Sequence, residues 1–265
     1  MADRRLDTLS KGLKVIQKFV FEKETWGTRE IDRGLGLSKS TALRILQTLR
    51  DHNFLNLSEQ DHKYTIGPEL WRLGVGLKGQ MNLSTIATSI LRKYANAINE
   101  TMHFFTYAHG QVIFEEVVEC THSLRFHLKL GTPYGITRGA AGKVILAFLP
   151  PEEMVEILKK LKKDPRVQLD KLRKQVEQVK TNGYSCTIGE RVKGLVGFAA
   201  PILGFQGVFL GGIGLAIPEV RYRAEDHKKF SDLVKSCAGE VSFIAGFTSE
   251  RTLIKPKEEV GSLAH

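Results

Sequence analysis

Arg44 and Gln47 lie about one turn apart in a stretch with helical spacing, and Ser40 lies one turn before Arg44. At about 100° per residue these three side chains share one arc, with Thr41 and Thr48 at its edge. Arginine offers forked donors that match guanine, glutamine offers an amide that matches adenine, and small hydroxyls reach phosphates. This is the chemistry by which a helix reads the major groove of duplex DNA. The alternative is that the arc is only the solvated face of an amphipathic helix.

The neighbouring elements must hold this arc in place. A first short helix over residues 28–35 is predicted with Thr28 as its N-cap, and Gly36 suits the tight turn that follows. Ser38 then caps a second helix over residues 39–53. The arc of that helix opposite the polar one is apolar and consists of Ala42, Ile45, Leu46 and Leu49.

A compact polar hairpin follows, with two short strands predicted within residues 54–66. The order of helix, turn, helix and hairpin is that of a winged helix-turn-helix, and it predicts duplex DNA as a partner. A winged helix that contacts protein or RNA is the alternative. At the hairpin tip, two residues could reach backbone phosphate. The predicted DNA contacts are Thr28, Ser38, Lys39, Ser40, Thr41, Arg44, Gln47, Thr48, His62 and Lys63.

Charge supports a polyanionic partner without locating its site. The chain has 265 residues, enough for two domains, with 42% apolar residues, a net charge of +10 and a pI near 9.5. Up to Ile66 there are twelve Lys or Arg and nine Asp or Glu, a surplus of only three positive charges. Specificity must therefore come from the polar arc more than from bulk attraction.

Other chemistry is less well supported. Three cysteines (Cys120, Cys186, Cys237) without paired spacing argue against disulfides and zinc, and no apolar run could span a bilayer, so we expect a cytoplasmic protein with no membrane partner, metal or cofactor. Residues 137–144 resemble a phosphate loop but lack its first glycine and its final Ser or Thr. Cys120 near His122 is expected to be structural, and no catalytic residue is predicted.

Three further segments complete the N-terminal part and the tail. A helix over residues 8–21 carries Leu9, Leu13, Ile16 and Val20 on one face and is expected to pack behind the two helices. After a DNA-binding domain at residues 1–66, a linker at 67–82 contains a helix over 69–77 that Gly74, Gly76 and Gly79 interrupt. Residues 249–265 are expected to form a flexible tail.

A second domain is predicted over residues 83–248, and its pattern alternates between helices and strands. Strands flanked by helices with antiparallel hairpins indicate an α+β sensor domain. A long charged stretch after Pro151 is read as a solvated helical surface. The expected helices are 84–99, 139–149 and 224–247, and the expected strands are 102–108, 111–118, 124–130, 184–187, 197–203 and 208–216.

The chain from Leu9 to Phe247 resembles the IclR family of bacterial transcription regulators. The strongest matching pieces are residues 35–49, 64–70, 131–133, 140–147, 183–184 and 194–201. The resemblance implies an N-terminal winged helix, a linker helix and a C-terminal GAF-like α/β domain that binds a small metabolite. It also implies dimers formed through the N-terminal region, tetramers in many members, and repression or activation of catabolic operons.

The resemblance further implies an effector pocket lined by Ala140, Ala141, Leu195, Gly197, Gly214 and Ala216. The helix beginning near residue 139 offers free N–H groups that suit a carboxylate, and Thr187 could add a hydroxyl. Because these positions are mostly Gly and Ala, we expect a larger or more apolar effector, such as an aromatic acid. Phe105 and Phe126 could then supply a stacking surface, although ordinary core packing is the simpler role for both.

The sequence thus predicts a ligand-responsive regulator that binds a pseudo-palindromic operator as a homo-oligomer, a dimer or a dimer of dimers, with a small organic acid as effector. The alternative from another class is an enzyme that acts on a small molecule in the C-terminal domain.

Overall fold

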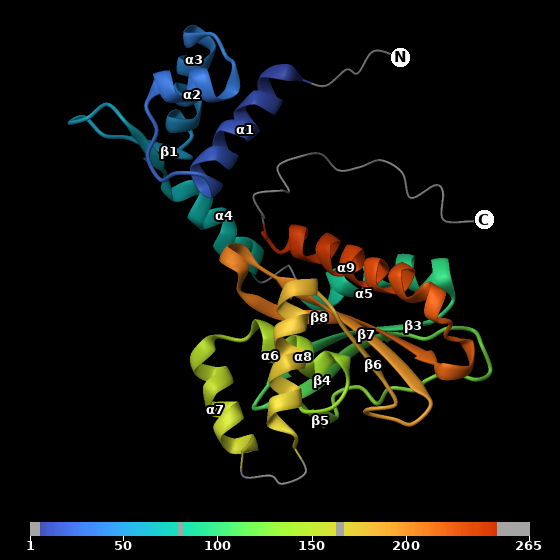
Figure 1. Ribbon diagram of the computed structural model, residues 1–265. Coiled ribbons are helices and arrows are strands. Elements are labelled where there is room, and N and C mark those ends of the chain that lie inside the picture. The colour runs from blue at the N-terminus through green and yellow to red at the C-terminus, as the bar shows by residue number, and fades with distance from the viewer. Residues whose placement is uncertain (1–5, 79–81, 163–166, 248–265) are drawn as a thin grey trace. The chain divides into compact units, whose positions relative to one another are not determined.

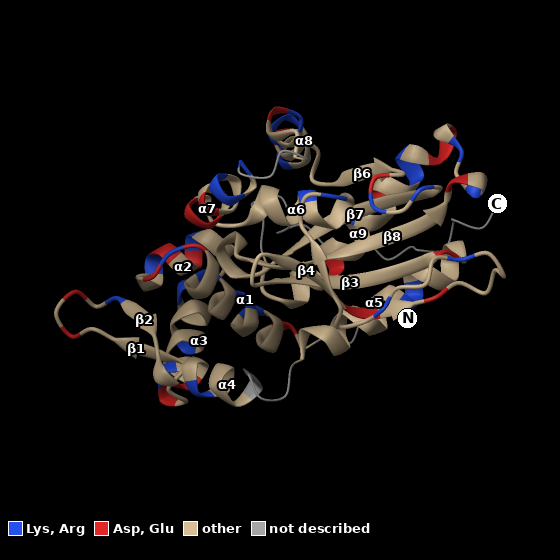
Figure 2. Cartoon of the chain, turned by 90° about the horizontal axis from the view of Figure 1, so that it is seen from below, with Lys and Arg blue, Asp and Glu red and all other residues tan. Residues whose placement is uncertain are grey.

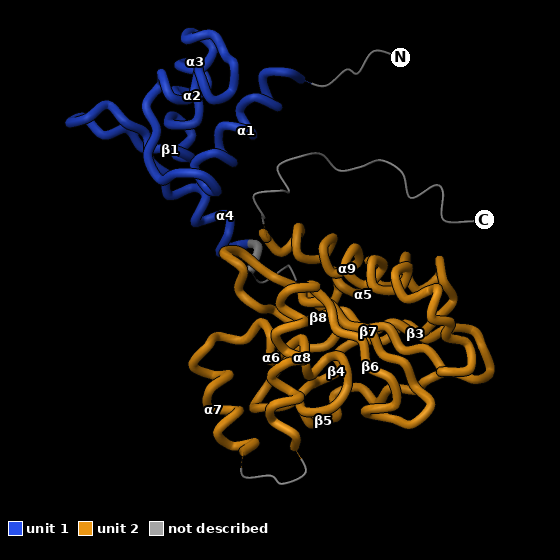
Figure 3. The backbone as a smooth tube through the Cα atoms, viewed as in Figure 1, with its two compact units in different colours: residues 1–82 blue, residues 83–265 orange. Residues whose placement is uncertain are grey.

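The computed structural model describes residues 6–78, 82–162 and 167–247. The chain divides into two compact units, residues 1–82 and 83–265, which Figure 3 colours separately. Each unit has its own hydrophobic core.

Unit 1 is a helical domain with a two-stranded hairpin (Figure 1). Its core joins Val15 and Phe19 of the first helix to Ile31, Leu46 and the hairpin, where Leu55 is buried. The wing strands pair antiparallel, and Trp26 adds a bridge to Tyr64. The elements are α1 (Asp7–Phe21), α2 (Thr28–Leu35), α3 (Lys39–Asp51), β1 (Leu55–Leu57), β2 (Tyr64–Ile66) and α4 (Pro68–Lys78).

The turn between α2 and α3 depends on local capping. Gly27 is the N-cap of α2, where the Glu30 carboxylate accepts its backbone N–H at 2.7 Å, so Thr28 lies inside the helix and its predicted role as N-cap is wrong. Gly36 ends α2 at φ 61°, a left-handed conformation that glycine adopts at little cost. Ser38 caps α3 by accepting the Thr41 N–H at 3.2 Å, as predicted.

The packing face of α1 differs from the predicted one. Val15 and Phe19 are buried, and Ile16 and Val20 are half-buried. Leu9 and Leu13 instead expose 60% and 54% of their surface. Helix α1 packs mainly against α3 and β2, and Val15 and Phe19 are its residues in the unit 1 core.

Helix α4 is continuous through Gly74 and Gly76, so the predicted interruption at these two positions is wrong; Gly79 lies outside the described residues. The side chain of Trp71 on α4 is 77% exposed, whereas Trp26 packs against the unit 1 core and carries Lys18 and Lys23 over its ring. The predicted tail at 249–265 also lies outside the described residues.

Unit 2 is built on one antiparallel sheet with strand order β5-β4-β3-β8-β7-β6 (Figure 1). Successive residues of a strand face opposite sides, so Met102 and Phe104 enter one core and His103 and Phe105 face the other side. The strands are β3 (Thr101–Ala108), β4 (Gln111–Val118), β5 (Pro133–Gly135), β6 (Ser185–Ile188), β7 (Leu195–Leu203) and β8 (Phe209–Pro218).

Helices cover both faces of this sheet. One face packs against α5 (Leu83–Ile98) and α9 (His227–Ile244), which lie side by side, and the other against α6 (Ala140–Phe148), with α8 (Leu169–Asn182) packed on α6. The charged stretch forms two helices, α7 (Pro151–Leu161) and α8. No described helix is long and apolar enough to cross a membrane.

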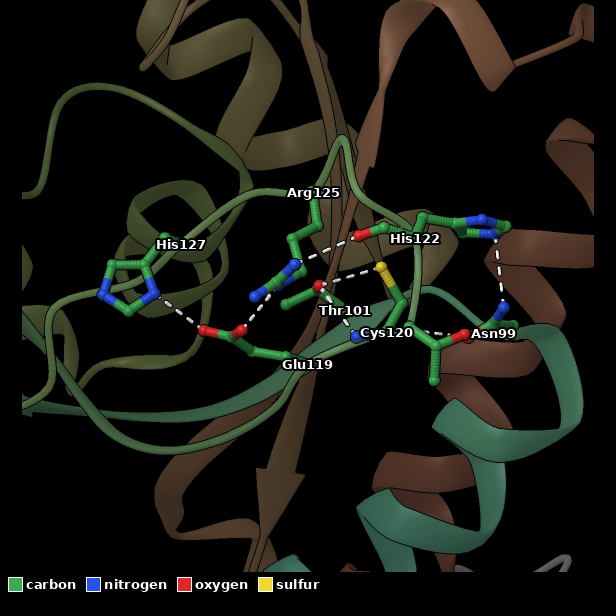
Figure 4. A network of polar contacts seen from close by, with 8 residues as sticks. Asn99, Thr101, Glu119, Cys120, His122, Arg125 and His127 are labelled. Carbon is green, nitrogen blue, oxygen red and sulfur yellow. Dashed lines mark hydrogen bonds and ion pairs between the residues drawn. The ribbon is translucent and has the colours of Figure 1, made fainter.

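The predicted strand over residues 124–130 is wrong, because this segment is a loop (Figure 4). The Glu119 carboxylate binds Arg125 and His127, each at 2.7 Å, and Arg221 donates to the Leu124 carbonyl at 2.7 Å. The alternation of apolar and polar residues in this loop directs Phe126 and Leu128 into the core of unit 2. The third strand of this unit in chain order is β5, where Tyr134 pairs with Val112 of β4.

Candidate functional site

The outer face of α3 presents two unengaged polar side chains. Arg44 and Gln47 are exposed, and neither side chain bonds to another residue within the described part of the chain. The opposite face buries Ala42, Ile45 and Leu46, so packing fixes the direction of the exposed face. Both side chains are thus free to hydrogen-bond base edges.

The hydroxyls near the start of α3 bond to one another. Ser38 Oγ lies 2.8 Å from Thr41 Oγ1 and 3.1 Å from Ser40 Oγ, while Thr48 donates to the Arg44 carbonyl at 2.9 Å. Lys39 is exposed beside them. Thr48 is therefore directed at its own helix backbone, which makes it the least available of the predicted α3 contacts.

The wing tip carries more negative than positive charge (Figure 2). Glu59 and Asp61 are exposed there beside His62, and Lys63 is half-buried. Bonds from the Ser58 hydroxyl and the Lys63 N–H hold the pKa of Asp61 below its usual value, so it is ionised at neutral pH. A phosphate contact from His62 or Lys63 would have to form beside this carboxylate.

A cavity in unit 2 lies between the sheet, the first turn of α6 and two loops. Its volume is about 40 Å³. Strand register brings Thr187, Gly197 and Ala216 side by side on β6, β7 and β8. Seven of the nine residues predicted to bind an effector line this cavity: Phe126, Ala140, Ala141, Thr187, Leu195, Gly197 and Ala216.

The other two predicted residues, Phe105 and Gly214, do not line the cavity. Phe105 is fully buried in the core beneath α6, where its ring covers Gly212. Gly214 is covered by the ring of His103, which occupies the space that a side chain at 214 would need. Gly212 and Gly214 thus make room for the rings of Phe105 and His103 on β3.

Sequence reasoning missed the two most polar residues of the cavity wall, His103 and Arg191. Burial, aided by the charge of Arg191, lowers the pKa of His103 to about 3, and its Nδ1 atom has no hydrogen-bond partner among the described residues. The Arg191 guanidinium lies 5.5 Å from the Phe114 ring and 5.1 Å from the Tyr134 ring. Arg191 could have been suspected from its place between two predicted pocket strands.

A carboxylate of the protein itself, that of Glu190, binds the start of α6. The Glu190 carboxylate accepts the Gly139 N–H at 3.3 Å and pairs with Lys143, whose side chain is 2% exposed. Burial lowers the pKa of Lys143 against the opposing effect of its pair with Glu190. Burial raises the pKa of Glu190, but the bonds from Lys143, the Gly139 N–H and Gln175 together outweigh it, so the net shift is downward. The N-terminus of α6, which was predicted to bind an effector carboxylate, therefore already binds the carboxylate of Glu190.

Two other hollows lie elsewhere in unit 2. A cleft of about 340 Å³ is lined by Arg138, Lys171 and Gln175, and one of about 530 Å³ lies near Phe148 and Phe209. Neither contains any of the predicted effector residues. Among the described residues, no group of three or more His, Cys, Asp or Glu could hold a metal ion.

These features define a two-domain transcription regulator with a helix-turn-helix and a C-terminal ligand-binding domain. The match to the bacterial transcriptional regulator IclR C-terminal model covers residues 77–243, and the match to the IclR helix-turn-helix domain covers residues 8–58. The chain belongs to the IclR family. The sequence-based assignment of family and fold is confirmed.

Curated relatives and solved structures agree with this. The chain is 25% identical to the regulator KdgR of Dickeya chrysanthemi, covering 92% of this chain and 83% of that one. It is 25% identical to the repressor IclR of Escherichia coli, covering 92% of each. HmgR of Pseudomonas aeruginosa shares the fold with a TM-score of 0.79 at 18% identity, over 91% of this chain and 99% of that one.

Proposed function

We propose that the chain binds a pseudo-palindromic operator as a homo-oligomer, with Arg44 and Gln47 of α3 reading base edges. The observation that carries the proposal is that both side chains are exposed and unengaged on a helix whose opposite face is buried. Ser38, Lys39, Ser40 and Thr41 at the helix start are suited to phosphate, as are Thr28 and the wing residues His62 and Lys63. Thr48 would add a contact only by releasing its backbone bond.

Apolar side chains on unit 1 support self-association. Leu9 and Leu13 of α1 and Trp71, Leu73 and Val75 of α4 are exposed. Exposed apolar groups on two helices of the DNA-binding unit suit a contact with a second copy, which would present two reading helices to successive major grooves.

We further propose that a small organic acid occupies the cavity of unit 2 and changes DNA affinity. The cavity is lined by residues of five strands, α6 and two loops, and these can shift with occupancy. An aromatic acid would require the loops to move, because about 40 Å³ is far below the roughly 150 Å³ that a benzene-sized ligand fills. The names of the relatives, which are regulators, favour this over an enzyme.

The test is a fluorescence anisotropy titration with duplex DNA from the protein's own upstream region. Arg44→Ala and Gln47→Ala are each expected to weaken specific binding about tenfold or more and to flatten base preference. Arg92→Ala, which removes an exposed positive charge from α5 in unit 2, is the control for net charge. Sequence preference that survives both α3 changes would reject the assignment, and turnover of added acids detected by mass spectrometry would favour the enzyme alternative.

A further inference from the structure

We infer that Arg191 is the anchor of the unit 2 cavity for the carboxylate of a small monocarboxylic acid, and that His103 provides a neutral hydrogen-bonding partner beside it. This inference rests on the proposed use of the cavity for an organic acid. It assigns the charge-recognising role to a loop side chain and not to the N-terminus of α6.

The charge of Arg191 is not balanced by a carboxylate within the described chain. Arg191 is half-buried, and none of its contacts in the described chain is with a carboxylate. One guanidinium nitrogen, Nη2, donates to the Arg138 carbonyl at 2.9 Å, and two aromatic rings cover the group. A guanidinium has five N–H donors in a fork that matches a carboxylate, so most of its capacity is left for a ligand.

The imidazole of His103 has an unsatisfied ring nitrogen among the described residues. His103 lines the same cavity, is 7% exposed, and has a buried Nδ1 atom without a partner in the described residues. A buried polar atom without a partner costs free energy, which a ligand can recover by hydrogen-bonding to it. The arrangement of a cation and a neutral imidazole at one cavity suits an anion with a polar atom near it.

The charge on the cavity wall favours a ligand with a single negative charge. Among the described lining residues, Arg191 is the one charged side chain, and the remaining walls are largely apolar, including Phe114, Phe126 and Leu128. A monocarboxylate balances that charge. A dicarboxylate would place its second charge against apolar walls without a partner, which is unfavourable.

The neighbouring charges of Glu190 and Arg191 have different surroundings. Glu190 turns to Lys143 and the Gly139 N–H, while Arg191 turns to the cavity. Glu190 thus has its own cation and does not neutralise Arg191. The loop therefore places the Arg191 guanidinium at the cavity wall, while the Glu190 carboxylate binds the first turn of α6.

The test is isothermal titration calorimetry of the full chain with propionate and benzoate, with the matched amides propionamide and benzamide, and with succinate. We expect at least one monocarboxylate to bind about tenfold or more tightly than its amide and more tightly than succinate. Arg191→Gln should abolish that preference, and Arg191→Lys should restore part of it. Arg138→Gln, which removes a neighbouring exposed guanidinium, should leave it unchanged.

A second measurement does not depend on the folding of variants. Phenylglyoxal modification of the unaltered protein, mapped by mass spectrometry, should show that the bound acid protects Arg191 and not Arg138. The inference is overturned if amides bind as tightly as acids, if the preference survives Arg191→Gln, if succinate binds best, or if no probe binds.

The same preparations are titrated with upstream duplex DNA, so that the two proposals fail separately. Specific DNA binding without acid binding rejects the anchor and retains the DNA-binding function. Acid binding that depends on Arg191, without specific DNA binding, retains the anchor and rejects the DNA-binding function.

Discussion

The imidazole of His103 lies directly over the backbone of Gly214 on the neighbouring strand. The two residues are register partners on β3 and β8, and a Cβ atom at position 214 would overlap the ring. The glycine therefore fixes where the imidazole sits, at the wall of the cavity.

Replacement of this glycine tests that relationship. Gly214→Ala should displace the His103 ring, destabilise unit 2 by about 1–3 kcal/mol and weaken acid binding. Gly135→Ala is a matched control, because a Cβ there would meet nothing within 4 Å. Urea unfolding followed by circular dichroism measures the difference. Equal stability of the two variants would mean that the ring relocates freely.

Acidification should lower the stability of the folded protein through the buried imidazole of His103. His103 is neutral in the folded state because burial lowers its pKa to about 3, whereas the unfolded chain takes up a proton near pH 6.5. The unfolded state then binds more protons between these values, so stability is complete above about pH 6.5 and falls as pH drops toward 3. The contribution is at most about 1.4 kcal/mol per pH unit. His103→Leu should remove that part of the slope in chemical denaturation between pH 7 and 5; an unchanged slope would show that His103 is not the group responsible.

The pair between Lys143 and Glu190 should be important for stability. Lys143→Met leaves the partly buried Glu190 without its cation, and we expect a loss of about 3 kcal/mol, limited by the partial exposure of Glu190. Lys180→Met is the control, since its bond to Glu177 lies on the exposed surface of α8 and contributes about 0–1 kcal/mol. Thermal unfolding of both variants compares them. A Lys143→Met protein as stable as the control would mean that the pair contributes no net stability.

Self-association should depend on the exposed apolar residues of unit 1. Trp71→Glu and Leu13→Glu are expected to lower the mass measured by light scattering and to weaken operator binding, with little change in unfolding temperature because both side chains are exposed. Val155→Glu on α7 serves as the control on the other unit. Assembly that persists in both unit 1 variants would place the interface elsewhere.

Sequence patterns predicted those parts of the fold that local physics determines. Ser38 and Gly36 define the helix-turn-helix because capping and left-handed turns depend on a few adjacent residues. The loop around Phe126 was mistaken for a strand because its conformation depends on Glu119 and Arg221, which lie outside the segment. The space left by Gly214 was misjudged for the same reason, since the ring that fills it comes from β3.

The candidate cavity shows the same division. Small residues at Ala140, Gly197 and Ala216 were placed at its wall, in agreement with where the structure has them. Arg191 was not, because its place between two predicted strands does not show which way its side chain points, and tertiary packing sets its guanidinium over the rings of Phe114 and Tyr134.

The positions of the two tryptophans give the molecule a built-in optical reporter. The chain has two tryptophans, Trp26 and Trp71, and both belong to unit 1, whereas the cavity belongs to unit 2. Light absorbed at 295 nm is therefore re-emitted from the DNA-binding unit alone. A change in that emission when propionate binds would report, without any label, that occupancy of the unit 2 cavity alters the surroundings of a tryptophan in unit 1.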